Sequence, residues 1–168
     1  MRFRIQSPLS LKKPPLPREY DTQLRAPEAD MLSWFTTYAR CFAWEYWERH
    51  DITGYRARTA EDVTCTIRLY RTCIYGNGNT RWQRYGIIPN QVDYWYYVQI
   101  RDPHGVGKRK SLLDFAASPK DVGHDALHLL HAAAKAAHEH QVSRPVLPVG
   151  ANACLRQYIN TLAQLAFH

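Results

Sequence analysis

The chain has 168 residues, 45% of them hydrophobic, which is enough for one globular domain with a substantial core. Its 22 lysines and arginines outnumber its 15 acidic residues, and the formal net charge of +7 favours phosphate-rich or acidic partners. No run approaches the ~20 apolar residues that cross a bilayer as a helix, so the sequence argues against an integral membrane protein.

The start of the chain is rich in proline and in basic side chains. Prolines at positions 8, 14, 15 and 17 interrupt any helix there, and Lys12 and Lys13 add positive charge. We therefore expect an extended basic arm over residues 1–27, followed by a single α+β domain over residues 28–168.

A helix is predicted over residues 27–51. Pro27 suits the first helical position, and apolar residues recur at helical spacing from Met31 to Tyr46. Three tryptophans fall outside this apolar stripe: Trp34, Trp44 and Trp47. Either a sheet edge or the arm covers them, or they form an exposed docking surface, because tryptophan is enriched among interface anchors.

The region from residue 62 to residue 115 changes from helical to strand periodicity. Its alternating segments predict three to four strands, at 63–73, 80–88, 94–101 and 108–115. The Gly-Asn-Gly-Asn run at 76–79 is typical of a tight hairpin turn. Such short connections predict an antiparallel meander.

Two helices are predicted after the sheet. The first begins with Ser118 as N-cap and Pro119 in the first helical position, and it ends near His140. The second has an apolar face made by Leu155, Tyr158, Ile159, Leu162 and Leu165. The order of one helix, a sheet and two helices defines an α+β fold.

Histidines are concentrated in the first of these two helices. On a helical wheel His124, His128, His131 and His138 share one polar ridge with Lys135. The residues expected to be buried opposite the ridge are Leu129, Leu130, Ala133, Ala136 and Ala137. The ridge is a solvated surface, a binding surface for acidic groups or phosphate, or a metal site at His124, His128 and His131. Lys135 would repel a cation and no carboxylate completes the ligands, so we expect no metal.

One face of the predicted sheet combines arginine and aromatic side chains. Alternation along the strands places on it Arg68, Tyr70, Trp95, Tyr97 and Arg101. Further basic residues on neighbouring strands or their ends are Arg81, Arg84, Lys108, Arg109 and Lys110. Such a face can hold single-stranded nucleic acid by base stacking and phosphate contact. Alternatively, the N-terminal helix or the proline-rich arm covers it.

The sequence contains none of the usual catalytic signatures, such as a nucleophile elbow, a phosphate loop or a His-Glu-x-x-His motif. Dispersed residues such as Asp102, His104 and Asp114 leave a small metal-dependent enzyme, for example a nuclease, as an alternative. We expect no enzymatic activity and no cofactor.

These patterns together indicate a protein that acts by binding. We expect an accessory subunit or inhibitor that docks in a larger protein or ribonucleoprotein complex and contacts RNA or DNA through the arm, Trp44, Trp47 and the basic sheet face. A purely structural subunit of an organellar or viral complex is the alternative. The four cysteines lack metal-binding spacing, so a reducing compartment, either the cytoplasm or an organellar matrix, is expected.

Overall fold

The computed structural model describes residues 24–74, 91–104, 111–140 and 143–165. In chain order the elements are α2 (Ala26–Thr37), the 3-10 helix η2 (Ala39–Cys41), β1 (Glu45–Arg49), β2 (Ile52–Arg58), β3 (Thr64–Ile74), β4 (Gln91–Arg101), β5 (Ser111–Ala117), α3 (His124–Glu139) and α4 (Ala151–Leu165). This order confirms the predicted α+β fold, although the described sheet has five strands rather than three or four. No helix in these ranges is long and apolar enough to cross a membrane.

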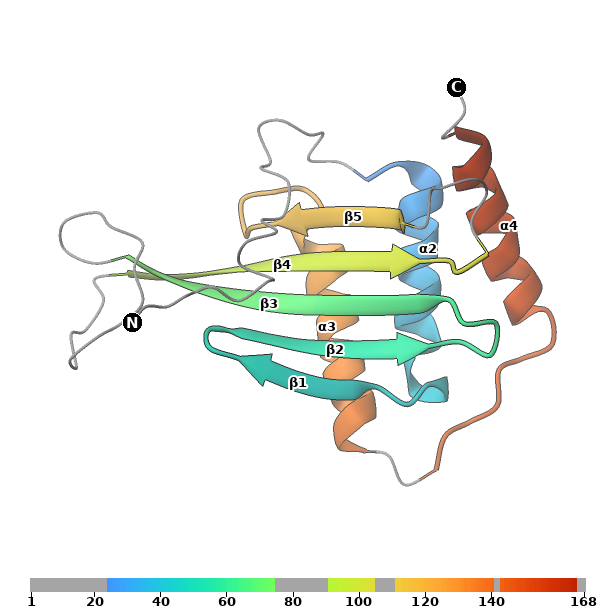
Figure 1. Ribbon diagram of the computed structural model, residues 1–168, viewed down its shortest axis with the longest axis horizontal. Coiled ribbons are helices and arrows are strands. Elements are labelled where there is room, and N and C mark those ends of the chain that lie inside the picture. The colour runs from blue at the N-terminus through green and yellow to red at the C-terminus, as the bar shows by residue number, and fades with distance from the viewer. Residues whose placement is uncertain (1–23, 75–90, 105–110, 141–142, 166–168) are drawn as a thin grey trace.

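The five strands form one antiparallel meander in which each strand pairs with its neighbours in sequence (Figure 1). Arg68 of β3, for example, lies opposite Gly54 of β2 on one side and Tyr97 of β4 on the other. Three of the predicted strands correspond to β3, β4 and β5. The strand predicted at 80–88 and the turn predicted at 76–79 lie outside the described residues.

The helix predicted over residues 27–51 is wrong beyond Thr37. Helix α2 ends there, with the backbone N–H of Tyr38 donating to the carbonyl of Trp34 at 3.0 Å. The second half of the predicted helix instead leads into the hairpin of β1 and β2, whose turn places His50 at a φ of 54°, in the left-handed region. Strand β1 replaces the last part of the predicted helix and pairs along its full length with β2, and this pairing overrides the helical spacing of Tyr46.

All three helices pack on the same face of the sheet, and the main core lies between the two layers (Figure 1). Side chains exposed by 1% or less include Met31, Leu32, Phe35, Cys65, Ile67, Val98, Ile100, Leu127, Leu130 and Leu155. The indole N–H of Trp34 donates to the carbonyl of Ala151 at 2.9 Å, which ties α2 to the start of α4. The predicted apolar face of α4 is confirmed for Leu155, Ile159 and Leu162, whereas Leu165 is exposed.

Helix α3 begins later than the capping pattern predicted. The carboxylate of Asp121 accepts hydrogen bonds from the backbone N–H and the hydroxyl of Ser118, at 2.8 and 3.1 Å. These residues therefore close a turn of their own, and the helix starts only at His124. Just before it, a Cβ at Gly123 would meet the Phe115 ring at 2.5 Å, so only glycine lets the chain pass this close to β5.

Candidate functional site

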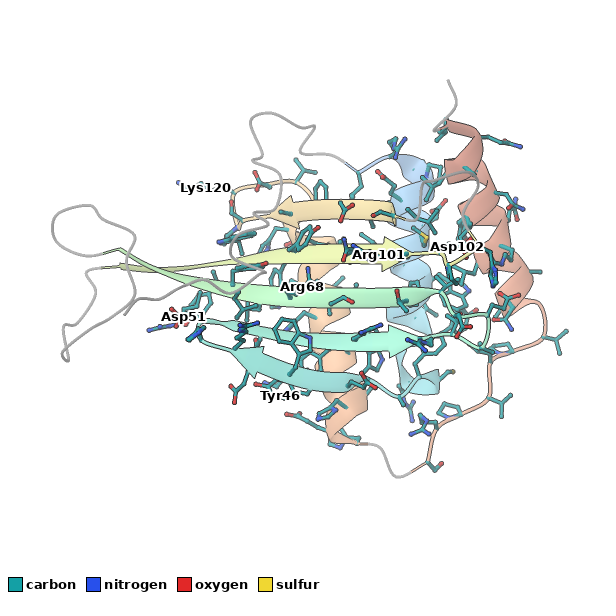
Figure 2. All side chains as sticks on the ribbon, in the orientation of Figure 1. Tyr46, Asp51, Arg68, Arg101, Asp102 and Lys120 are labelled. Carbon is teal, nitrogen blue, oxygen red and sulfur yellow. The ribbon has the colours of Figure 1, made fainter. Side chains whose placement is uncertain are left out.

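The second face of the sheet, which we call the open face, is covered by no described helix (Figure 1). Side chains alternate between the two faces along each strand, so the strand registers define its members. The open face consists of Glu45, Trp47, Arg49, Ile52, Gly54, Arg56, Arg58, Thr64, Thr66, Arg68, Tyr70, Trp95, Tyr97, Gln99, Arg101, Ser111, Asp114 and Ala116. Figure 2 shows Arg68 near the middle of this face and Arg101 toward the end of β4.

Arg68 is held between two aromatic rings. Its Cζ atom lies 5.3 Å from the centroid of the Tyr97 ring and 6.0 Å from that of the Trp47 ring. These distances are typical of cation–π contacts. A Cβ at Gly54 would lie 2.7 Å from the Trp47 indole, so glycine at this position is what lets the indole rest on the strand beside Arg68.

The burial of Arg68 affects its electrostatics. Desolvation lowers the pKa of the Arg68 guanidinium below its usual value, while the nearby Tyr70 and Tyr97 act in the opposite direction. Its Nε atom is buried and has no hydrogen-bond partner within the part of the chain that the structure describes. Because arginine keeps its charge in proteins, the face contains a partly desolvated cation with donor capacity to spare.

A second pair of rings lies beside Arg68. Tyr70 and Trp95 are opposite each other in the β3–β4 register, with ring centroids 4.2 Å apart and planes inclined by 7°. Tyr70 packs with Ile52 and Tyr97 in a small cluster of buried side chains, while Trp47 and Trp95 are half-buried at its margin. These packed aromatic side chains form the aromatic floor of the open face.

Asp114 holds the polar side of this floor in place. Its carboxylate accepts hydrogen bonds from the Tyr97 hydroxyl at 2.5 Å, the Gln99 amide at 2.9 Å and the Ser111 hydroxyl at 2.5 Å. Burial, followed by the hydrogen bond to Asp114, raises the pKa of Tyr97, so this hydroxyl stays protonated and keeps donating. Asp114 therefore fixes the orientation of Tyr97 and, through it, of Arg68.

The structure brings six residues of the predicted site together on the open face: Trp47, Arg68, Tyr70, Trp95, Tyr97 and Arg101. Trp44 is different, because it is only 2% exposed and its indole N–H donates to the carbonyl of Ala39 at 2.9 Å. It belongs to the core, as does Trp34, and the prediction of Trp44 as a docking residue is corrected accordingly. The predicted residues outside the described ranges are Lys12, Lys13, Arg81, Arg84, Lys108, Arg109 and Lys110.

Two residues of the open face were missed by sequence reasoning. Arg56 and Arg58 lie on β2, are exposed, and face the same side as Arg68. The sequence does contain a signal for them, because within residues 52–58 the apolar Tyr55 and Ala57 alternate with the two arginines, as in a half-buried strand. It was missed because residues 52–58 lie between the predicted helix and the predicted sheet region, where no element was expected.

The histidine ridge of α3 does not simply face solvent, which corrects the expectation of a solvated surface. The ring of His131 lies 5.4 Å from the Tyr55 ring and 5.3 Å from the Tyr96 ring, measured between centroids. His128 Nδ1 is hydrogen-bonded to the Tyr96 hydroxyl at 2.8 Å. The Nδ1–H of His138 donates to a backbone carbonyl of the chain preceding β1, also at 2.8 Å. The ridge therefore packs against the sheet.

The side of α3 opposite the histidines is buried only in part. Leu130 and Ala137 are buried as predicted, but Leu129 is 59% exposed and Ala136 is exposed. Leu127 and Ala134 are buried in addition. The buried side of α3 differs from the predicted one because α3 contacts α2 and η2 as well as the sheet. The residues that it buries therefore extend round the helix toward the histidines.

Other potential site residues have structural partners or stand apart. The Asp102 carboxylate pairs with Arg156 of α4 at 2.9 Å and accepts the backbone N–H of His104 at 3.1 Å, whereas Asp114 lies on the open face. In the described part of the chain, no three His, Cys, Asp or Glu side chains are grouped so that they could hold a metal ion.

Comparison of the chain with protein-family models, with curated proteins and with solved structures finds no match.

Proposed function

We propose that the protein is a non-enzymatic binding subunit that holds single-stranded nucleic acid on its open face, within a larger nucleoprotein assembly. The observation that carries this proposal is Arg68, a half-buried guanidinium held between Trp47 and Tyr97 in the middle of a face that displays further arginines. A desolvated cation between rings is costly to bury for stability alone, which supports a role in binding an anion.

The chemistry of the face suits both parts of a nucleotide. Trp47 and Trp95 are half-buried, so part of each indole stays in contact with solvent beside the buried aromatic cluster. Base stacking on such rings contributes ~1–3 kcal/mol per base. Arg56, Arg58 and Arg101 are exposed on the same face and are available for phosphate contacts.

A single strand fits this surface better than a duplex. Aromatic rings stack on base faces, which neighbouring base pairs cover in a duplex and which a single strand leaves accessible. The open face is also a sheet surface without a described helix that could enter a groove. The connection between β3 and β4 (75–90) and that between β4 and β5 (105–110) lie outside the described residues.

The proposal is tested by fluorescence anisotropy with labelled oligonucleotides of ~15 nucleotides, single-stranded and duplex, at several salt concentrations. We expect the full chain to bind the single strands more tightly than the duplex. A double variant, Arg56→Ala with Arg101→Ala, should weaken this binding about tenfold or more and reduce its dependence on salt.

The matched control is the double variant Arg40→Ala with Arg144→Ala, which removes the same charge. Arg40 is exposed in η2, Arg144 is exposed on the connection between α3 and α4, and neither is part of the open face. This control should leave the affinity nearly unchanged. No binding at ~50 mM salt, or an equal loss in the control variant, would count against the proposal.

A further inference from the structure

Strand β1 has an outer edge without a described partner. It pairs with β2 on one side and is the last strand of the described sheet on the other (Figure 1). All its side chains are exposed except the half-buried Trp47. The unpaired backbone groups of such an edge are a template for a further strand.

The sequence of β1, Glu-Tyr-Trp-Glu-Arg, is self-complementary when it is read antiparallel to itself. With the pairing centred on Trp47, Glu45 of each copy lies opposite Arg49 of the other, and Tyr46 lies opposite Glu48. Neither Glu45 nor Arg49 has an ion-pair partner among the described residues. Within one chain the Tyr46 hydroxyl already donates to Glu48 at 3.3 Å, so these two side chains are compatible.

We propose that β1 pairs antiparallel with β1 of a second copy of this chain, centred on Trp47, to form a two-fold symmetric dimer. Two-fold symmetry makes each contact occur twice, so the dimer has two Glu45–Arg49 pairs. Oppositely charged residues directly across an antiparallel pair of strands attract, and like charges repel.

The charges select this register over its neighbours. Only alternate residues of β1 direct their backbone groups to the outer edge, so the pairing can shift only by two positions at a time. Such a shift moves the centre of the pairing by one residue, to Tyr46 or to Glu48. Both of these registers lose the two Glu45–Arg49 pairs, and the second places Glu48 opposite Glu48. Charges on an edge strand usually prevent pairing, but here their spacing favours one register, the one centred on Trp47.

Pairing in this way joins the open faces of the two copies. Residues directly opposite each other in a sheet have side chains on the same side, so the two Trp47 side chains meet on the open face. The basic and aromatic surface then runs across both copies. The dimer does not depend on the proposed nucleic-acid binding, because its strand pairing and its Glu45–Arg49 contacts need no nucleic acid.

Sedimentation equilibrium of the full chain without nucleic acid tests the dimer. The average mass should rise with protein concentration from 19.6 kDa toward twice that value, reaching a clear excess by ~200 µM. Arg49→Glu or Glu45→Arg alone should weaken association at least about tenfold, since each replaces two attractive pairs by two repulsive ones. The double variant Glu45→Arg with Arg49→Glu restores both pairs and should restore association.

The control for charge is Lys120→Glu, which changes the net charge as Arg49→Glu does but lies in the exposed turn after β5 (Figure 2). It should leave the mass distribution unchanged. A mass of 19.6 kDa at every concentration, or a double variant that associates no better than the single ones, would overturn the proposal. Circular dichroism confirms that each variant is folded.

A crosslink provides a second test that leaves the charged residues in place. Trp47→Cys should form an intermolecular disulfide on mild oxidation, because directly opposite Cβ atoms lie ~5 Å apart. Tyr46→Cys should not, because its two copies are two positions apart along the strand, or ~7 Å. Equal crosslinking of the two variants would contradict the register centred on Trp47.

Discussion

His131 predicts a measurable dependence of stability on pH. Its ring packs against Tyr55 and Tyr96, and its Nε2 atom is buried without a hydrogen-bond partner in the described part of the chain. Burial, together with the nearby Lys135 and His128, lowers the pKa of His131 from 6.5 to about 4. The folded protein therefore keeps this ring neutral at pH values where the unfolded chain protonates it.

The size and sign of the effect follow from proton linkage. Below pH 6.5 the unfolded state binds a proton that the folded state does not bind until about pH 4, so stability is fully present above pH 6.5 and falls toward pH 4. At about pH 5 the two pKa values correspond to a loss of about 2 kcal/mol. Because the ring is only partly shielded from solvent, we expect a loss of about 1 kcal/mol.

Urea unfolding at about pH 7.5 and about pH 5 measures this loss. In His131→Leu the difference in unfolding free energy between the two pH values should be smaller than in the wild type by about 1 kcal/mol. His140→Leu removes an exposed histidine beyond the end of α3 and serves as the control. The other titratable groups around the His131 ring, which are Lys135, His128, Tyr55 and Tyr96, are the same in all three proteins. If His131→Leu loses as much stability on acidification as the wild type, the burial argument is refuted.

Two further substitutions test the packing of the fold. Gly54→Ala places a methyl group against the Trp47 indole, so it should lower the free energy of unfolding in urea by about 1–2 kcal/mol and weaken oligonucleotide binding. An unchanged affinity would show that the position of this indole does not matter for binding. Asp102→Ala removes the 2.9 Å partner of Arg156 and leaves it Glu61 at 3.4 Å, so it should cost about 1–2 kcal/mol. A double-mutant cycle with Arg156→Ala should then show coupling, and strictly additive losses would contradict the ion pair.

Much of the sheet and of the open face could be predicted from local sequence patterns. Alternation with a period of two is a direct consequence of strand geometry, so Arg68, Tyr97 and Arg101 were assigned to one face before any pairing was known. The hairpin of β1 and β2 could not be predicted in the same way. Tyr46 also fits the helical spacing of the residues before it, and only the pairing of β1 with β2 decides between the two periods.

The histidines of α3 show most clearly which features the local sequence pattern determines and which depend on the tertiary structure. The sequence by itself determined that His124, His128, His131 and His138 share one side of a helix, because the helical repeat alone sets which side chains lie together. Only the tertiary structure decided what that side meets. Since α3 packs on α2, η2 and the sheet at once, its buried arc extends to the histidines and places His131 against aromatic rings.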